Sequence, residues 1–90
     1  IVKMESRIIS KKEIAQIAKN TIADVSEIDV EAIDGEKRFV EDLSISSFEM
    51  FQLSYELEEK LKIELDVDDF MDVEKVDDFI EIIANTYFGL

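Results

Sequence analysis

The sequence contains no cysteine, no histidine and no proline, and only two of its 90 residues are glycine. Without cysteine there can be no disulfide, no thiolate metal site and no thiol nucleophile. Without histidine the commonest general base is missing, and a Ser-His-Asp arrangement is impossible. The scarcity of proline and glycine argues against a β fold with many turns. We therefore expect helices joined by ordered turns, and a chain that is not an enzyme by itself.

Positive charge is also scarce. The chain has 10 basic and 23 acidic residues, which gives a net charge of −13. Such a charge disfavours nucleic acid and anionic membranes as partners and favours a basic protein surface. No apolar run reaches the length of about 18 residues that a membrane span needs, and no signal peptide is recognisable. We expect a cytoplasmic protein.

One acidic run, Asp66-Val67-Asp68-Asp69, raises the alternative of a calcium-responsive helical protein. An EF-hand loop needs oxygen ligands at its first, third and fifth positions and glycine at the sixth. Counted from Asp66, the fifth and sixth positions are Phe70 and Met71, and counted from Asp68 the third position is Phe70. The motif fails, so we predict no specific metal site.

Hydrophobic spacing predicts three amphipathic helices and one short helical turn. The helices are expected over residues 10–24, 47–61 and 75–87, and the turn lies within 66–73. The segment 26–45 has no steady period, but its apolar residues suggest that it packs onto the core. The predicted fold class is all-α, a small bundle of three main helices plus one short helix with a long first connection. We expect one domain over residues 1–90, with its core at about 10–87.

The second helix begins with a recognisable start signal. Ser46, followed three residues later by Glu49, matches a capping box, in which the serine hydroxyl and the glutamate each bond a backbone N–H. Ser47 then occupies the first helical position, on the surface and beside several unpaired N–H groups. Such a position favours an anion.

Two apolar stripes run along the helix predicted over 47–61. One consists of Met50, Leu53, Leu57 and Leu61, and the other, nearly opposite, consists of Phe48, Phe51 and Tyr55. A domain of this size buries one side of a helix easily and both sides only with difficulty. We expect the first stripe in the core. The aromatic stripe either fills the core under the long connection or forms an exposed apolar contact strip for a transient partner.

The segment Phe39-Val40-Glu41-Asp42-Leu43, followed after two residues by Ser46-Ser47-Phe48, resembles the attachment motif of the acyl carrier protein family. Leu57-Glu58-Glu59, Ile63-Glu64-Leu65 and Val76 through Ile83 also fall at family-like distances, so the resemblance covers roughly residues 10–85. It implies that Ser47 carries 4′-phosphopantetheine, taken from coenzyme A by a separate transferase. Acyl groups would ride on the thiol of this arm as thioesters, so the missing nucleophilic sulfur is imported.

The resemblance also implies how the chain meets its partners. These would be a phosphopantetheinyl transferase and acyl-processing enzymes of fatty-acid, polyketide or related biosynthesis, which dock through basic patches on a monomeric carrier. The partner-binding residues that it implies are Ser46, Phe48, Glu49, Phe51, Tyr55, Glu58 and Glu59. The acyl chain would tuck among the helices, between the core stripe of the second helix and apolar side chains of residues 63–80.

Three positions depart from the family pattern. Ser46 stands where the family usually has aspartate, Phe48 where it usually has leucine, and Asp66 where it usually has proline. Serine caps a helix about as well as aspartate, so the fold should tolerate the first change. These departures indicate a specialised carrier. The alternative is an acidic docking module that has the carrier fold and is never modified.

Overall fold

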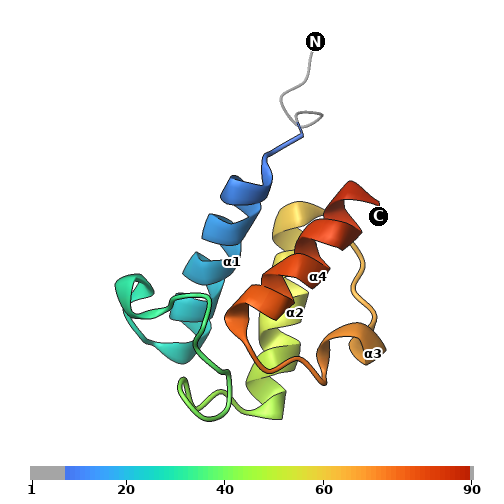
Figure 1. Cartoon of the computed structure of the whole chain (residues 1–90). Coiled ribbons are helices and arrows are strands. Elements are labelled where there is room, and N and C mark those ends of the chain that lie inside the picture. The colour runs from blue at the N-terminus through green and yellow to red at the C-terminus, as the bar shows by residue number, and fades with distance from the viewer. Residues whose placement is uncertain (1–7, 90) are drawn as a thin grey trace.

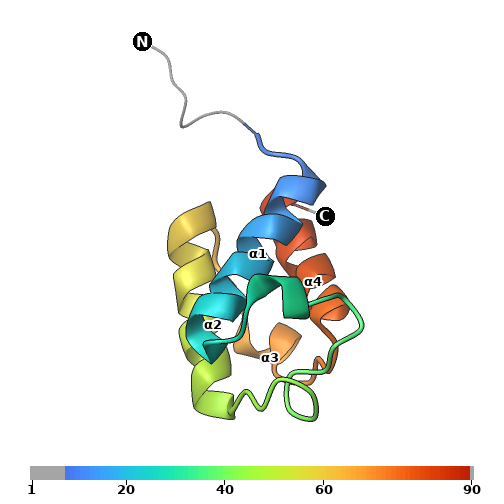
Figure 2. The same cartoon turned by 90° about the vertical axis from the view of Figure 1, so that its left-hand side faces the viewer.

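Helices make up most of the part of the chain that the computed structural model describes, residues 8–89 (Figure 1). The long helices are α1 (Lys11–Ser26), α2 (Ser47–Leu61) and α4 (Val76–Phe88), and the short elements are the 3-10 turn η2 (Val30–Ala32) and α3 (Val67–Phe70). In both views α1 runs opposite to α2 and α4 (Figures 1 and 2). Within residues 8–89 β-pairing is limited to one isolated antiparallel bridge, between Arg38 and Lys75. The predicted all-α fold class is confirmed, while the predicted domain limits, 1–90, reach beyond the described residues.

The helix limits follow local capping. The capping box predicted at Ser46 with Glu49 is present, and a second one joins Ser10 with Glu13 at the start of α1. The limits predicted for the second helix agree with α2, and those of the last helix differ from α4 by one residue at each end. The first helix runs two residues further than predicted, because Ser26 continues it and donates its hydroxyl to the carbonyl of Ile22 at 2.7 Å. No helix among the described residues is long and apolar enough to cross a membrane.

The long connection after α1 supplies the start of α4 with hydrogen-bond partners. The N-cap residue of α4, Lys75, makes no side-chain cap bond. Instead, the N–H of Val76 donates to the carbonyl of Lys37, and the N–H of Asp77 donates to that of Gly35, each at 3.0 Å. The first N–H groups of a helix have no partner inside it. The connection therefore stands in for a side-chain cap, and it is held against α4 in return.

Apolar residues of the connection complete the core. Ile33, Phe39, Leu43 and Ile45 are at most 5% exposed, so the prediction that this segment packs onto the core is confirmed. The ring of Phe39 meets that of Phe79 edge to face, with centroids 5.5 Å apart. Burying a side chain of this kind stabilises the fold by about 1.5–3 kcal/mol. The connection is thus a structural part of the bundle, and it leads directly to Ser47.

Candidate functional site

Ser47 is the first residue of α2, and its side chain is exposed. Its neighbour Ser46 takes the capping role: the Ser46 hydroxyl accepts from the N–H of Glu49 at 3.2 Å, and the Ser46 N–H donates to Glu49 Oε1 at 2.8 Å. Within residues 8–89 the Ser47 hydroxyl has no hydrogen-bond partner. Two adjacent serines therefore differ in role, since one hydroxyl holds the helix start and the other faces outward.

A hydrogen-bonded loop presents this helix start. Asp42 accepts from the N–H of Arg38 through Oδ2 at 2.8 Å, and its own N–H donates back to the Arg38 carbonyl at 3.0 Å. The N–H of Ile45 donates to the carbonyl of Phe39 at 2.8 Å, and the Ile45 side chain is buried. Ser44, between the loop and α2, adopts a left-handed conformation with φ 56°. Sequence reasoning missed this feature, because serine carries no signal for positive φ.

The aromatic stripe of α2 is exposed, whereas the other stripe lies in the core. The side chains of Phe48, Phe51 and Tyr55 are 76%, 46% and 63% exposed, and we call these three residues the aromatic strip. The opposite stripe is at most 7% exposed and consists of Met50, Leu53, Leu57 and Leu61. Of the two readings of the aromatic residues, core filling is wrong because all three side chains are exposed, and their role as a contact strip stays a prediction. Phe51 alone leans inward, with its ring edge to face against Phe70 of α3 at 6.3 Å.

The glutamates of α2 are less available than their charge suggests. Glu49 is half-buried and engaged in the capping box. Glu58 is half-buried as well, and its Oε2 accepts from the N–H of Leu65 at 2.7 Å, which ties the segment after α2 to the helix. Glu59 is exposed. The structure thus brings all seven partner-binding residues implied by the resemblance onto α2 or its cap, but it gives three of them, Ser46, Glu49 and Glu58, bonds inside the fold.

One basic residue of α2 also turns inward. Lys60 Nζ donates to the hydroxyl of Thr21 on α1 at 2.8 Å, and Thr21 Oγ1 donates to the carbonyl of Ile17 at 2.8 Å. Thr21 is fully buried. Neither partner could be inferred from spacing, because the two residues lie on different helices.

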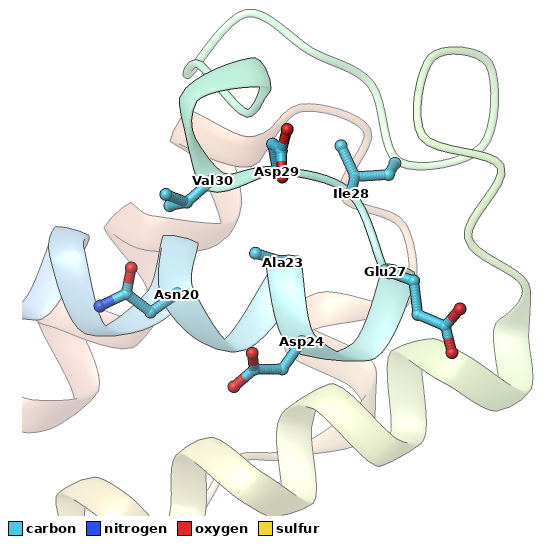
Figure 3. A pocket seen from close by; sticks show the side chains of 7 residues that line it. All are labelled: Asn20, Ala23, Asp24, Glu27, Ile28, Asp29 and Val30. Atoms are coloured by element: carbon cyan, nitrogen blue, oxygen red, sulfur yellow. The ribbon is translucent and has the colours of Figure 1, made fainter.

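Two surface hollows lie away from Ser47. One, of about 400 Å³, lies between the end of α1 and η2, and Figure 3 shows the residues that line it. Its carboxylates, those of Asp24, Glu27 and Asp29, point in different directions and do not converge (Figure 3). The other, of about 420 Å³, lies between α3 and α4. Within residues 8–89 no group of three or more carboxylates is placed to hold a metal ion.

The acidic run that raised the calcium alternative has a structural role. Asp66 is the N-cap of α3, and its Oδ1 accepts from the N–H of Asp68 at 3.1 Å. A side-chain oxygen that caps a helix satisfies one of the N–H groups at its start. Asp66 therefore stabilises the start of the short helix.

Comparison with known proteins gives the same family as the motif around Ser47. A family model described as a phosphopantetheine attachment site matches residues 16–83. The acyl carrier proteins of two strains of Nitratidesulfovibrio vulgaris, DP4 and Hildenborough, are each 34% identical to the chain over 67 residues, which is 74% of this chain and 88% of theirs. The acyl carrier protein of Campylobacter jejuni subsp. doylei is 31% identical over 67 residues, 74% of this chain and 87% of its own. The chain belongs to the acyl carrier protein family, it is a carrier and not an enzyme, and its cofactor is phosphopantetheine.

Proposed function

We propose that the Ser47 hydroxyl is the attachment point of 4′-phosphopantetheine and that the chain carries acyl intermediates as thioesters on this arm. The observation that carries the proposal is the exposure of Ser47 at the first position of α2, inside the matched segment 16–83. The capping box supports the proposal, because Ser46 and Glu49 hydrogen-bond to each other, and the hydroxyl of Ser47 is left available to react.

The attachment is a group transfer from coenzyme A. The Ser47 oxygen forms a bond to the phosphorus that bears pantetheine, and the diphosphate bond of coenzyme A breaks. Adenosine 3′,5′-bisphosphate leaves, and the hydroxyl proton passes to the transferase or to water. The resulting phosphodiester would lie beside the N-terminus of α2, where the helix dipole stabilises an anion by about 0.3–1 kcal/mol.

The arm would supply the only thiol of the loaded protein, since the chain has no cysteine. Because the arm would carry the single thiol, no second thiol of the chain would compete for the acyl group. We propose that the partners are a phosphopantetheinyl transferase and acyl-processing enzymes of fatty-acid, polyketide or related biosynthesis. The net charge of −13 favours partners with basic surfaces and opposes association with a second copy. We therefore propose that the chain acts as a monomer. We also propose that it forms one domain.

Intact-mass spectrometry tests the attachment. The chain is incubated with coenzyme A, Mg²⁺ and a transferase of broad carrier range, and we expect a gain of one phosphopantetheine that fragmentation locates at Ser47. Ser47→Ala should show no gain. Ser46→Asp is the matched control, because it removes the neighbouring hydroxyl, keeps a capping oxygen and should still gain the arm. An adduct on Ser46 or Ser44 would contradict the assignment, and no adduct at all would favour the unmodified docking module.

A further inference from the structure

Four phenylalanine rings form a continuous row from the surface near Ser47 into the core. Phe51 follows Ser47 by four residues, so the row begins on the same side of α2, one turn further. The centroid of its ring lies 6.3 Å from that of Phe70 on α3, which lies 6.3 Å from that of Phe79 on α4. Phe79 in turn meets Phe39 of the long connection, with centroids 5.5 Å apart. We call these four phenylalanines the phenylalanine row.

The phenylalanine row is closely packed. Its three contacts are edge to face, and their centroid distances lie within the range of about 4.5–7 Å that paired aromatic rings prefer. Phe39, Phe70 and Phe79 are at most 2% exposed, whereas Phe51 is 46% exposed. A core packed in this way has no room for additional methylene groups. An aliphatic chain that enters between α2 and α3 along the row must therefore displace at least one ring.

The row occupies the place that the family resemblance implies for an acyl chain. That place lies between the core stripe of α2 and apolar side chains of residues 63–80, and Phe70 and Phe79 are among them. In both views α3 lies at the end of the bundle where α2 and α4 begin, which is the end that bears Ser47 (Figures 1 and 2). Displacing a buried ring gives up apolar burial comparable to what the entering chain gains, so entry has little net driving force.

The two surface hollows suit an aliphatic chain no better. The hollow between α3 and α4 is lined mainly by charged side chains, those of Asp69, Asp72, Glu74, Lys75 and Asp78. The hollow at the end of α1 has acidic and amide side chains in its wall (Figure 3). Within residues 8–89 every buried side-chain nitrogen or oxygen already has a hydrogen-bond partner, so the interior offers no free polar group to a polar cargo.

On the basis of the function proposed above, we propose that this carrier bears a short or polar acyl group and that the phenylalanine row keeps this cargo in solvent, outside the bundle. A group of about four carbons or fewer gains little from burial. A polar group would lose its hydrogen bonds to water on entering an apolar core. The thioester then stays accessible to partner enzymes, and long aliphatic chains are disfavoured as cargo.

The dependence of thermal unfolding on chain length tests the inference. A transferase of broad carrier range loads Ser47 from coenzyme A derivatives that bear acetyl, butyryl, octanoyl or dodecanoyl groups, with an amide in place of the thioester so that the cargo survives heating. A cargo that is buried only in the folded state raises the unfolding midpoint. For the original sequence we expect the four loaded forms to agree within about 2 °C.

Phe70→Ala opens the row and is the decisive variant. It should lower every midpoint, because it leaves a cavity, and it should place the octanoyl form at least about 5 °C above the acetyl form. Phe88→Ala is the matched control, because it removes a ring of the same size from α4 that is 40% exposed and meets Tyr87 instead of the row. It should leave the midpoint independent of chain length. Phe70→Leu makes a smaller opening and replaces Phe70→Ala if that variant does not fold.

Cleavage of thioester-linked cargo by hydroxylamine is a second measurement, and it needs no variant. Each rate is divided by the rate for the same acyl group on free pantetheine, which removes the intrinsic effect of chain length. We expect the butyryl and octanoyl ratios of the original sequence to agree within about twofold, because neither cargo is withdrawn from solvent.

The outcomes separate the inference from the function on which it rests. A midpoint that rises by about 5 °C or more from the acetyl to the octanoyl form of the original sequence, or an octanoyl thioester protected by about fivefold or more, overturns the inference while Ser47 remains the attachment site. Midpoints independent of chain length in the Phe70 variants as well would also overturn it, since the rings would then not be what excludes the chain. If Ser47 accepts no arm from coenzyme A or any derivative, the proposed function fails and the inference falls with it.

Discussion

The backbone carbonyl of Gly35 accepts a hydrogen bond from the N–H of Asp77 at 3.0 Å, and the Asp77 carboxylate occupies the space where a side chain on residue 35 would begin. This contact joins the long connection to the first turn of α4, whose N-cap has no side-chain bond of its own. Gly35 has no positive φ, so the close approach of Asp77 is the reason for a glycine at this position.

The effect of Gly35→Ala on the free energy of unfolding should change sign according to the residue at position 77. When Asp77 is present, Gly35→Ala forces the Asp77 side chain to move, and we expect a loss of about 1 kcal/mol in the free energy of unfolding. In an Asp77→Ala background the space is open, and the same change should stabilise by about 0.4–1 kcal/mol through the unfolded state. Urea denaturation of the four proteins of the cycle measures both values. A stabilisation of equal size in both backgrounds would refute the steric explanation.

Ser44→Gly should make the loop before Ser47 more stable. The φ of 56° at Ser44 is a left-handed conformation, which costs a residue with a side chain about 1–2 kcal/mol and costs glycine little. The greater conformational entropy of glycine in the unfolded chain offsets about 0.5–1 kcal/mol of this gain. We therefore expect the free energy of unfolding to rise by about 0.5 kcal/mol, measured by thermal or urea unfolding. Ser44→Val is the opposing control and should destabilise, because a branched side chain disfavours this conformation. A clear loss of stability in Ser44→Gly would mean that the hydroxyl has a role of its own.

The capping role of Ser46 predicts a difference between two substitutions. Ser46→Ala removes the oxygen that accepts from the N–H of Glu49, and it should cost about 1 kcal/mol of unfolding free energy. Ser46→Asp keeps such an oxygen and should change stability by less than about 0.5 kcal/mol. Circular dichroism during urea unfolding is sufficient for this comparison. Equal losses in both variants would show that the position matters for some reason other than the cap.

Glu58 and Glu59 are adjacent in sequence, yet they should differ in their effect on stability. Glu58→Ala breaks the 2.7 Å bond from the N–H of Leu65, and hydrogen bonds to charged groups contribute about 1.5–3 kcal/mol, less here because Glu58 is only half-buried. We expect a loss of about 1 kcal/mol and faster hydrogen exchange at the Leu65 amide. Glu59→Ala is the control and should be neutral within about 0.5 kcal/mol. Unchanged exchange at Leu65 in Glu58→Ala would argue that the bond is not formed in solution.

The sequence by itself determined the features that depend on interactions between residues three or four positions apart. The capping boxes at Ser10 and Ser46 mark where two helices begin, because each pairs a serine with a glutamate three residues on. The spacing of apolar residues likewise predicts the faces of α2, and Gly89 marks the end of α4 with a φ of 76°. Local geometry suffices for such features, and it placed Ser47 at the start of a helix before any packing was known.

Tertiary structure alone decided which surfaces face water and which polar groups are engaged. Spacing describes both stripes of α2 as apolar, and only packing within the bundle buries Leu53 and leaves Phe48 exposed. The bonds from Leu65 to Glu58 and from Asp77 to Gly35 join groups that are 7 and 42 positions apart. Their partners meet only when the chain has folded, because burial and long-range hydrogen bonds depend on the whole bundle and not on the neighbours of a residue in sequence.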